Sequence, residues 1–482
     1  MEILSLMSVL MDLNQWMVLV MFLVFIFMLF RGVPVAYALV GVSLIFFLIG
    51  EFVLDENRKL IEQYIEFKRT GLTYQKLAAN AGRFFGGIIK NPVLVALPMF
   101  IYMGLMLDQS GVAQRMMRNM QVLFGALKGG LALTVMLIGI ILAASTGVIG
   151  ASVVLLGVMA LPTMMKQDYA KPIATGTIAA SGTLGILIPP SIMLVIMSDQ
   201  LAISLGDLFM GALFPGLILG GLYIVFIIVY GVIKPSAMPL PENREPVTSK
   251  IVIGVLLSVI PPIFLILLVL GSIFFGFATP TEASGLGALG ATILALMSGN
   301  LKWRTLLDVI RQTMNSVGYI VGIFIAANFF AYILRRYGGD EIIENMVLNF
   351  SSDPYVVIWF ILLIIFLLGF LLDWIEITLI IMPLMLPVIN ALNIPIDGFG
   401  VVDNPPIVWF AILVAVTLQT SFLTPPVGFA LFYLKGVCPP EISLGHIYKG
   451  IIPFVILQLF GLAIVFYFPE LVTWLPAKAY GN

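Results

Sequence analysis

The residues of this sequence that are best suited to bind a ligand surround two proline pairs. The first segment, 180–191, reads Ala-Ser-Gly-Thr-Leu-Gly-Ile-Leu-Ile-Pro-Pro-Ser, and the second, 417–428, reads Thr-Leu-Gln-Thr-Ser-Phe-Leu-Thr-Pro-Pro-Val-Gly. Proline removes a backbone N–H and clashes with the preceding turn, and glycine permits unusual dihedral angles, so a helix splits at such a place. The split leaves free carbonyls on one side and free N–H groups on the other.

These free backbone groups indicate two kinds of ligand. Free carbonyls suit a small hard cation, and the positive end of the following half-helix favours a carboxylate. Hydroxyl groups could complete the cation shell, and the candidates are Ser145, Thr146, Ser181, Thr183, Thr420, Ser421 and Thr424. Sodium with an organic anion is therefore the natural pairing. The alternative is structural, because Pro and Gly are frequent in membrane helices and small residues allow helices to pack closely.

The composition places the elements that carry these segments in a membrane. Of 482 residues, 61% are hydrophobic and 10% are charged, whereas soluble proteins are about 25% charged. The 24 Lys+Arg and 25 Asp+Glu leave no basic surface for nucleic acid. The single cysteine, Cys438, and single histidine, His446, exclude an intrachain disulfide and a multi-histidine metal site. We expect His446 to be an ordinary loop residue, and no intramembrane-protease or hydrolase motif is present.

Apolar stretches long enough to cross a bilayer recur along the chain, free of charged residues except for Asp12 in the first and Asp373 and Glu376 in 354–396. A crossing needs about 20 residues, and on the order of a dozen crossings fit into 8–30, 32–50, 91–107, 129–165, 172–198, 208–233, 251–281, 283–301, 312–334, 354–396, 404–434 and 450–469. The charged stretch 51–90 must lie outside the hydrocarbon. Its Leu60, Ile61, Tyr64, Ile65 and Phe67 suit either a short amphipathic helix or a solvated loop. The Pro-rich stretch 234–250 reads as a linker between two halves.

Two of the apolar stretches are too long for one crossing. The stretch 129–165 is interrupted by Ser, Thr and Gly at 145–152, and 354–396 is interrupted just after Gly369 by Asp373 and Glu376. Re-entrant helical hairpins fit both, since non-helical backbone at membrane depth must be covered by protein or line a cavity. Each hairpin precedes one proline pair, and the two pairs lie almost half the chain apart. This order predicts a duplicated unit with binding sites at its interruptions.

The two acids near these elements have competing interpretations. Asp373 could hold sodium or cap the short helix that follows it. Glu282 follows Thr279 and Pro280 and fits a capping box at a helix start, so we expect a structural role.

Several motifs resemble the large membrane subunit of tripartite ATP-independent periplasmic (TRAP) transporters, the DctM-like subunit. They are 180–191, Thr-Pro-Thr-Glu-Ala-Ser-Gly at 279–285 and Leu-Thr-Pro-Pro-Val-Gly at 423–428, and the segments 32–39, 91–94 and 103–104 also resemble the family. The resemblance covers most of the chain. It implies an all-α polytopic membrane protein with inverted repeats, an elevator-type transporter in which a scaffold holds a mobile transport domain of two re-entrant hairpins and two Pro-Pro-broken helices.

The resemblance also implies function and partners. Family members use a sodium gradient to import carboxylates, such as C4-dicarboxylates, sialic acid, 2-oxo acids and lactate, across the bacterial inner membrane. They pair with a small membrane subunit of about four helices and receive substrate from a periplasmic binding protein. No cofactor beyond the sodium ion is implied. The closest alternative is a stand-alone sodium/carboxylate symporter that needs no binding protein, and a channel is a more distant one.

The family's functional residues carry over by position. The implied sodium-binding residues are Ser145, Gly147, Gly150, Gly182, Thr183, Gly185, Gly369, Asp373, Thr420 and Thr424. The implied substrate-binding residues are Ser181, Pro189, Pro190, Ser191, Ser421, Pro425 and Pro426. The sequence departs from the family at the first hairpin tip, 145–150, and at 419–422, where Gln-Thr-Ser-Phe replaces a more apolar run.

The expected domain organisation follows the two halves. Residues 1–128 form N-terminal scaffold helices with the polar connection 51–90, and 129–233 form the first half of the transport domain, with hairpin 129–165 and broken helix 172–198. After the linker 234–250 come scaffold helices over 251–350. The second transport half is 351–434, with hairpin 354–396 and broken helix 404–434, and 435–482 form a C-terminal loop and final helix.

Overall fold

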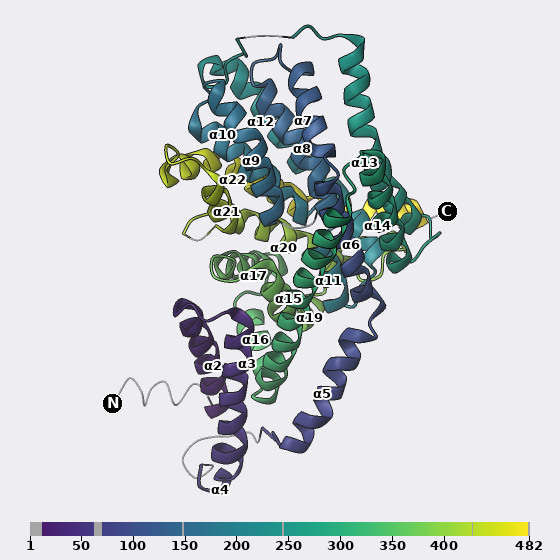
Figure 1. The fold of residues 1–482 in the computed structure, drawn as a ribbon. Coiled ribbons are helices and arrows are strands. Elements are labelled where there is room, and N and C mark those ends of the chain that lie inside the picture. Colours follow the sequence, from purple (N-terminus) through teal and green to yellow (C-terminus); the bar gives the residue numbers. More distant parts are fainter. Residues whose placement is uncertain (1–11, 62–69, 147–148, 243–244, 427, 481–482) are drawn as a thin grey trace. The chain divides into compact units, whose positions relative to one another are not determined.

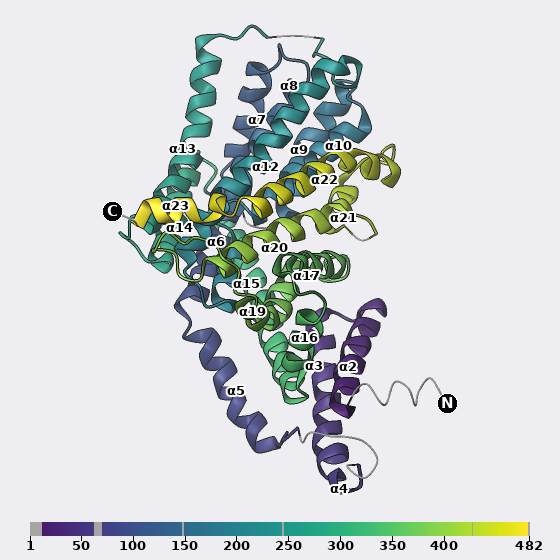
Figure 2. The same cartoon turned by 180° about the vertical axis from the view of Figure 1, so that it is seen from behind.

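A computed structural model describes residues 12–61, 70–146, 149–242, 245–426 and 428–480, and all regular structure within them is helical (Figures 1 and 2). The predicted all-α fold is confirmed. The chain divides into two compact units, each assembled from separated segments. One comprises Met1–Asn91, Gly318–Ile361 and Ile375–Ile394, and the other comprises Pro92–Val317, Leu362–Trp374 and Pro395–Asn482.

The first unit is held together by aromatic side chains. Its helical elements are α2 (Leu13–Phe30), α3 (Val35–Leu48), the π-helix η1 (Ile49–Asp55), α4 (Arg58–Ile61), α5 (Tyr74–Ile89), the second part of α15 (Trp303–Arg336), α16 (Gly339–Leu348), the first part of α17 (Pro354–Leu368), most of α18 (Trp374–Glu376), the π-helix η4 (Ile377–Ile381) and α19 (Met382–Ala391). Phe330 of α15 packs its ring against Phe25 of α2 at 5.4 Å between centroids. Tyr337 donates its hydroxyl to the carbonyl of Phe46 at 2.8 Å. The hydrogen bond gives the Tyr337 hydroxyl a partner inside an otherwise apolar core.

The second unit contains both proline pairs. Its remaining elements are α6 (Pro92–Gln109), α7 (Val112–Leu123), α8 (Gly130–Thr146), α9 (Ile149–Lys166), α10 (Lys171–Thr183), the 3-10 turn η2 (Leu184–Ile186), α11 (Ile192–Gln200), α12 (Leu205–Ile233), η3 (Pro235–Ala237), α13 (Ser249–Phe274), α14 (Pro280–Met297), α20 (Pro405–Leu423), α21 (Phe429–Val437), α22 (Leu444–Tyr467) and α23 (Glu470–Tyr480).

Close packing in this unit depends on small residues. Helices α10 and α22 lie side by side in both views (Figures 1 and 2). They meet at Gly176 and Gly450, where a Cβ on either glycine would collide with the backbone of the other helix. Helices α6 and α14 also pack together, with Tyr102 and Thr292 joined through their hydroxyls at 3.0 Å. Glycine contacts of this kind let helix backbones approach closely in an apolar medium.

Ten helices among the described residues are long and apolar enough to cross a membrane. Two shorter apolar helices, Gly130–Leu142 and Pro354–Leu368, belong to the first arms of the predicted hairpins. Side chains such as Leu257, Phe264 and Leu267 on α13 are more than half exposed, as an apolar lipid-facing surface would be. The predicted polytopic organisation is confirmed, although α14, expected as the apolar stretch 283–301, is not among the ten.

Two expectations are corrected at polar stretches. The helix that begins at Val35 continues through η1 to Asp55 as one span, so the apolar segment runs past its predicted end at 50. His446 is not a loop residue, because it lies in the first turn of α22, where its Nδ1 accepts the Ser443 N–H at 3.1 Å in a capping box. The sequence signal for this helix start was Ser443 three residues earlier.

The charged stretch 51–90 contains an amphipathic helix in its second part. This helix, α5, begins after Thr73, whose hydroxyl caps the N–H of Lys76 at 3.3 Å. The short amphipathic helix considered for 60–67 falls mainly on residues 62–69, which lie outside the described part of the chain.

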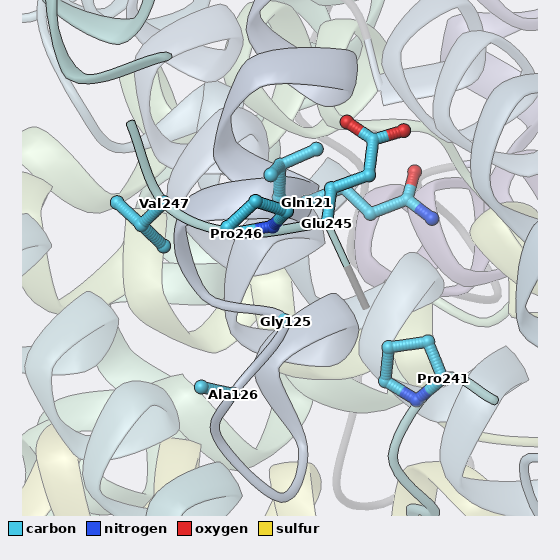
Figure 3. A pocket seen from close by; sticks show the side chains of 8 residues that line it. Gln121, Gly125, Ala126, Pro241, Glu245, Pro246 and Val247 are labelled. Carbon is cyan, nitrogen blue, oxygen red and sulfur yellow. The ribbon is translucent and has the colours of Figure 1, made fainter. Parts of the chain in front are cut away.

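The first part of the Pro-rich linker packs on its surroundings, whereas residues 245–250 are exposed. Met238 is fully buried, and its sulfur lies 2.8 Å from where a Cβ on Gly129 would stand. Figure 3 shows the cavity of about 370 Å³ that the linker residues Pro241 and Glu245 share with Gln121 and the turn after α7.

The capping box predicted at Glu282 is confirmed. The Thr279 hydroxyl accepts the Glu282 N–H, and a Glu282 carboxylate oxygen accepts the Thr279 N–H at 2.8 Å. These hydrogen bonds from Thr279 hold the pKa of Glu282 below its usual value. Glu282 therefore orders the start of α14.

We expect Gly176→Leu to destabilise the protein by about 1–3 kcal/mol, because the new side chain must push α10 away from α22. The measurement is thermal unfolding of the detergent-purified chain. Gly221→Leu in α12 is the matched control, since a Cβ there meets nothing within 4 Å. Equal melting temperatures for the two variants would contradict the contact between the helices.

Candidate functional site

The first proline pair breaks a buried helix as predicted. Helix α10 ends at Thr183, a 3-10 turn follows to Ile186, and α11 resumes only at Ile192. The Pro189–Pro190 bond is cis. Pro189 offers no N–H to the carbonyl of Gly185 four residues earlier, so that carbonyl has no regular helical partner. All of the predicted site residues on this element are buried; they are Ser181, Gly182, Thr183, Gly185, Pro189, Pro190 and Ser191.

The second proline pair repeats the arrangement. Helix α20 ends at Leu423, the Pro425–Pro426 bond is cis, and α21 begins at Phe429. Gly428, the N-cap residue of α21, has a φ of 56°, which a residue with a side chain rarely adopts. The two broken helices are close to each other, because α20 contacts both η2 and α11. The structure thus brings the two predicted ligand-binding segments together within one unit.

The hydroxyl groups near the breaks donate to carbonyls of their own helices. Ser181 donates to Ile178 at 3.0 Å and Thr183 to Ala180 at 2.9 Å. In α20, three hydroxyls do the same: Thr420 to Val416, Ser421 to Leu418, and Thr424 to Thr420 at 3.0, 2.8 and 2.8 Å. A hydroxyl oxygen that donates its proton still has lone pairs with which to accept or to coordinate. These oxygens therefore suit a cation better than an anion.

The half-helices after the breaks present uncapped starts. Ser191, the N-cap residue of α11, gives its hydroxyl to the Ile186 carbonyl at 2.6 Å and makes no side-chain cap. Gly428 has no side chain with which to cap α21. The first N–H groups of a helix have no partner within the helix and attract negative charge. Both starts therefore offer a carboxylate the chemistry that the sequence predicts.

Each hairpin packs onto its broken helix through a glycine. In the first half, a Cβ on Gly139 of α8 would collide with Ser181 of α10. In the second half, a Cβ on Gly369, just after α17, would lie 2.8 Å from the Ser421 Cβ of α20. Gly182 lets α9 approach equally closely, since its Cβ would lie 3.1 Å from the Val153 nitrogen. The two halves thus use the same kind of contact to join hairpin and broken helix.

Tyr433 packs against the first hairpin, and no sequence pattern marked it. Its ring atom Cζ lies 3.0 Å from where a Cβ on Gly150, in the first turn of α9, would stand. The Asp373 carboxylate at the second hairpin interacts electrostatically with the Tyr433 phenol. Asp373 also accepts the Trp374 N–H at 2.8 Å through Oδ1. Trp374 is the first residue of α18, so this bond lies at the start of that helix, where the capping interpretation placed Asp373.

The structure does not describe the side chains of two predicted site residues at the first hairpin tip. Gly147 lies outside the described residues, and Ser145 belongs to α8 but its side chain is not described. The roles assigned to them, and the sodium and substrate roles of the other candidates, stay predictions.

Gln419 is a further polar group at this site. It is fully buried in α20, directly before Thr420, and neither its amide oxygen nor its amide nitrogen has a hydrogen-bond partner. A buried amide without partners is costly unless a ligand or water satisfies it. The departure of 419–422 from the family pattern was the sequence signal for this residue.

Comparison with known proteins identifies the family. The model of the family described as "Tripartite ATP-independent periplasmic transporter, DctM component" matches residues 20–471. The chain belongs to this family. It is therefore a TRAP transporter large permease subunit and a multi-pass membrane protein.

Two relatives of this TRAP subunit match over nearly their whole length. The C4-dicarboxylate TRAP transporter large permease protein DctM of Vibrio cholerae is 29% identical, over 96% of this chain and 98% of that protein. The sialic acid TRAP transporter large permease protein SiaM of the same organism is 27% identical, over 93% and 96%. Among solved structures, the YdaH transporter of Alcanivorax borkumensis shares the fold with a TM-score of 0.60 at 12% identity, covering 88% of this chain and 98% of that one.

A cysteine pair tests the hairpin contact in this TRAP subunit. In a Cys438→Ser background, Gly369→Cys and Ser421→Cys start with their Cβ atoms 2.8 Å apart, so a local shift of about 1 Å brings the pair into the disulfide range of about 3.5–4.5 Å. We expect copper phenanthroline to oxidise the pair in membranes, so that maleimide-polyethylene glycol no longer labels it. The control combines Gly369→Cys with Thr417→Cys, one turn away on α20. Labelling of both pairs alike after oxidation would contradict the contact.

Proposed function

We propose that this subunit imports an organic acid across the bacterial inner membrane, driven by a sodium gradient. The substrate arrives from a periplasmic binding protein, and a small four-helix membrane subunit completes the transporter. The observation that carries the proposal is the pair of broken helices, which put hydroxyl oxygens before each break and an uncapped helix start after it.

Charge balance supports joint binding of sodium and a carboxylate. The predicted site residues include one acid, Asp373, and no lysine, arginine or histidine. A carboxylate bound at the helix starts would add a second negative charge to a buried site. Sodium held by carbonyl and hydroxyl oxygens offsets that charge, and this compensation makes the binding of ion and acid interdependent.

The similarity of the relatives' substrates favours an acid as well. The relatives reported above are named for C4-dicarboxylates and for sialic acid. These compounds differ in size and have a carboxylate in common. We infer that the helix starts of α11 and α21 receive that carboxylate, with Ser181, Ser191 and Ser421 next to them, and that the rest of the pocket selects the acid. Movement of the two hairpins with their broken helices, as in an elevator, would carry the site across the membrane.

Reconstitution tests the function directly. We expect proteoliposomes with this chain and its small subunit to accumulate a labelled organic acid only with both the binding protein and an inward sodium gradient. Replacing sodium by choline is the control for the gradient. Sodium-driven uptake without binding protein would establish the stand-alone symporter instead, and uptake that does not saturate would indicate a channel.

Asp373→Asn separates sodium binding from helix capping. Asparagine keeps the Oδ1 acceptor for Trp374 and removes the charge. If Asp373 binds sodium, we expect the sodium concentration for half-maximal uptake to rise about tenfold, a loss of 1.4 kcal/mol.

The matched control is Asp353→Asn, because Asp353 is exposed and accepts the Tyr355 N–H at 2.9 Å at the start of α17. Unchanged sodium dependence in both variants would leave Asp373 a capping residue only.

A further inference from the structure

A second cavity lies in the unit that holds the proline pairs, lined by the apolar Ile101, Leu105 and Ala151 as well as by polar side chains. It has a volume of about 260 Å³. Asp108 of α6 faces it from one side and Ala151 of α9 from another, and α15 contributes Gln312, Asn315 and Ser316. Positions three and four apart lie on one face of a helix, so these three side chains form a continuous polar wall.

Asp108 is a partly exposed residue of the cavity lining, and one of its two carboxylate oxygens is buried. Its Oδ1 is shielded from solvent and has no hydrogen-bond partner. No ion pair joins Asp108 to another described residue, and no lysine, arginine or histidine is among the described residues that line the cavity. The residue is the last but one of α6, so it lies at the end of a helix that is long and apolar enough to span a membrane. An ionisable group in such a helix is expensive and is a functional candidate by default.

The lining determines which ligand would fit. A carboxylate, two amide groups and a hydroxyl supply oxygen donors, which hard cations prefer over softer ligands. The single negative charge of Asp108 is cancelled by one monovalent ion, whereas a divalent ion would leave an excess positive charge. A second carboxylate without a cation would be repelled by Asp108, so the cavity favours the cation over an acid alone. The cavity is larger than a bare ion, so the ion would keep part of its water shell.

We propose that this cavity binds a monovalent cation, sodium, through Asp108, Gln312, Asn315 and Ser316. The identity of the ion rests on the sodium coupling proposed above, whereas the need for a cation rests on the cavity alone. Ala151 adjoins Gly150, the residue on which Tyr433 packs. An ion in the cavity therefore lies beside the first turn of the hairpin arm α9, and its arrival and departure can influence how that arm packs.

Two other states of Asp108 compete with this proposal. The positive end of α9 could stabilise the carboxylate without an ion, because Ala151 lies in the first turn of that helix. A proton could also neutralise the carboxylate. Both alternatives predict that removing the charge leaves sodium binding unchanged.

The test measures sodium bound to the full-length chain in lipid nanodiscs. Equilibrium binding of radioactive sodium gives the number of ions per chain, and thermal unfolding in sodium chloride against choline chloride gives the stabilisation. We expect Asp108→Asn to remove about one sodium ion per chain and to reduce the sodium-dependent rise in melting temperature. Asp168→Asn is the matched control, since Asp168 is exposed and its φ of 54° is readily adopted by asparagine.

Ser316→Ala decides the question if Asp108→Asn does not fold. It keeps the charge and removes one oxygen donor, so we expect sodium affinity to fall several-fold with the same number of ions at saturation. Unchanged ion number in Asp108→Asn, or unchanged affinity in Ser316→Ala, overturns the proposal. An Asp108-dependent effect that follows pH and ignores sodium assigns the cavity to a proton and overturns it too.

The outcome is independent of the transport assay. Loss of one ion in Asp108→Asn, together with uptake that needs no sodium in the unsubstituted protein, would support the cavity and reject the proposed coupling. Sodium-driven uptake with an unchanged ion number in Asp108→Asn would support the coupling and reject the cavity.

Discussion

Non-helical backbone inside an apolar protein must be covered by other protein groups, and this constraint organises the unit that contains the two proline pairs. The breaks expose carbonyls and N–H groups that water cannot reach. Neighbouring helices must therefore approach closely, and Gly139, Gly182 and Gly369 make this possible because a Cβ at each would collide with the adjacent helix. The glycines near the breaks thus serve first to enclose the polar backbone. Ligand binding depends on that enclosure.

The same enclosure determines which hydrogen bonds the buried hydroxyls make. With no water available, Ser181, Thr420 and Ser421 donate to carbonyls one turn earlier. Their oxygens are then left as acceptors in a region of low polarity, where an uncompensated acceptor is costly. A cation relieves this cost, and a carboxylate at the uncapped helix starts balances the cation. Packing and chemistry therefore favour the same pair of ligands.

The sequence predicted the features that depend on local backbone chemistry. The broken helices follow from the absence of a proline N–H, and the hairpins follow from stretches too long for one crossing. The capping box at Glu282 follows from residue spacing. Tyr433 and the Asp108 cavity were not predicted. The residues around each of them come from helices that are far apart in the sequence, so no local sequence pattern marks either feature. His446 was misassigned because polar residues around it concealed the Ser443 cap.

The two halves repeat their packing but not their charge. Gly139 on Ser181 and Gly369 on Ser421 are equivalent contacts between a hairpin arm and a broken helix. The second hairpin carries Asp373 at its break, whereas 145–152 of the first carries no acid. Two cations bound at equivalent places would therefore meet different electrostatic surroundings, and the one near Asp373 would be held more firmly before the substrate arrives. A site without its own acid would depend more on the incoming carboxylate, and in the proposed transport cycle this dependence would couple the ion to its substrate.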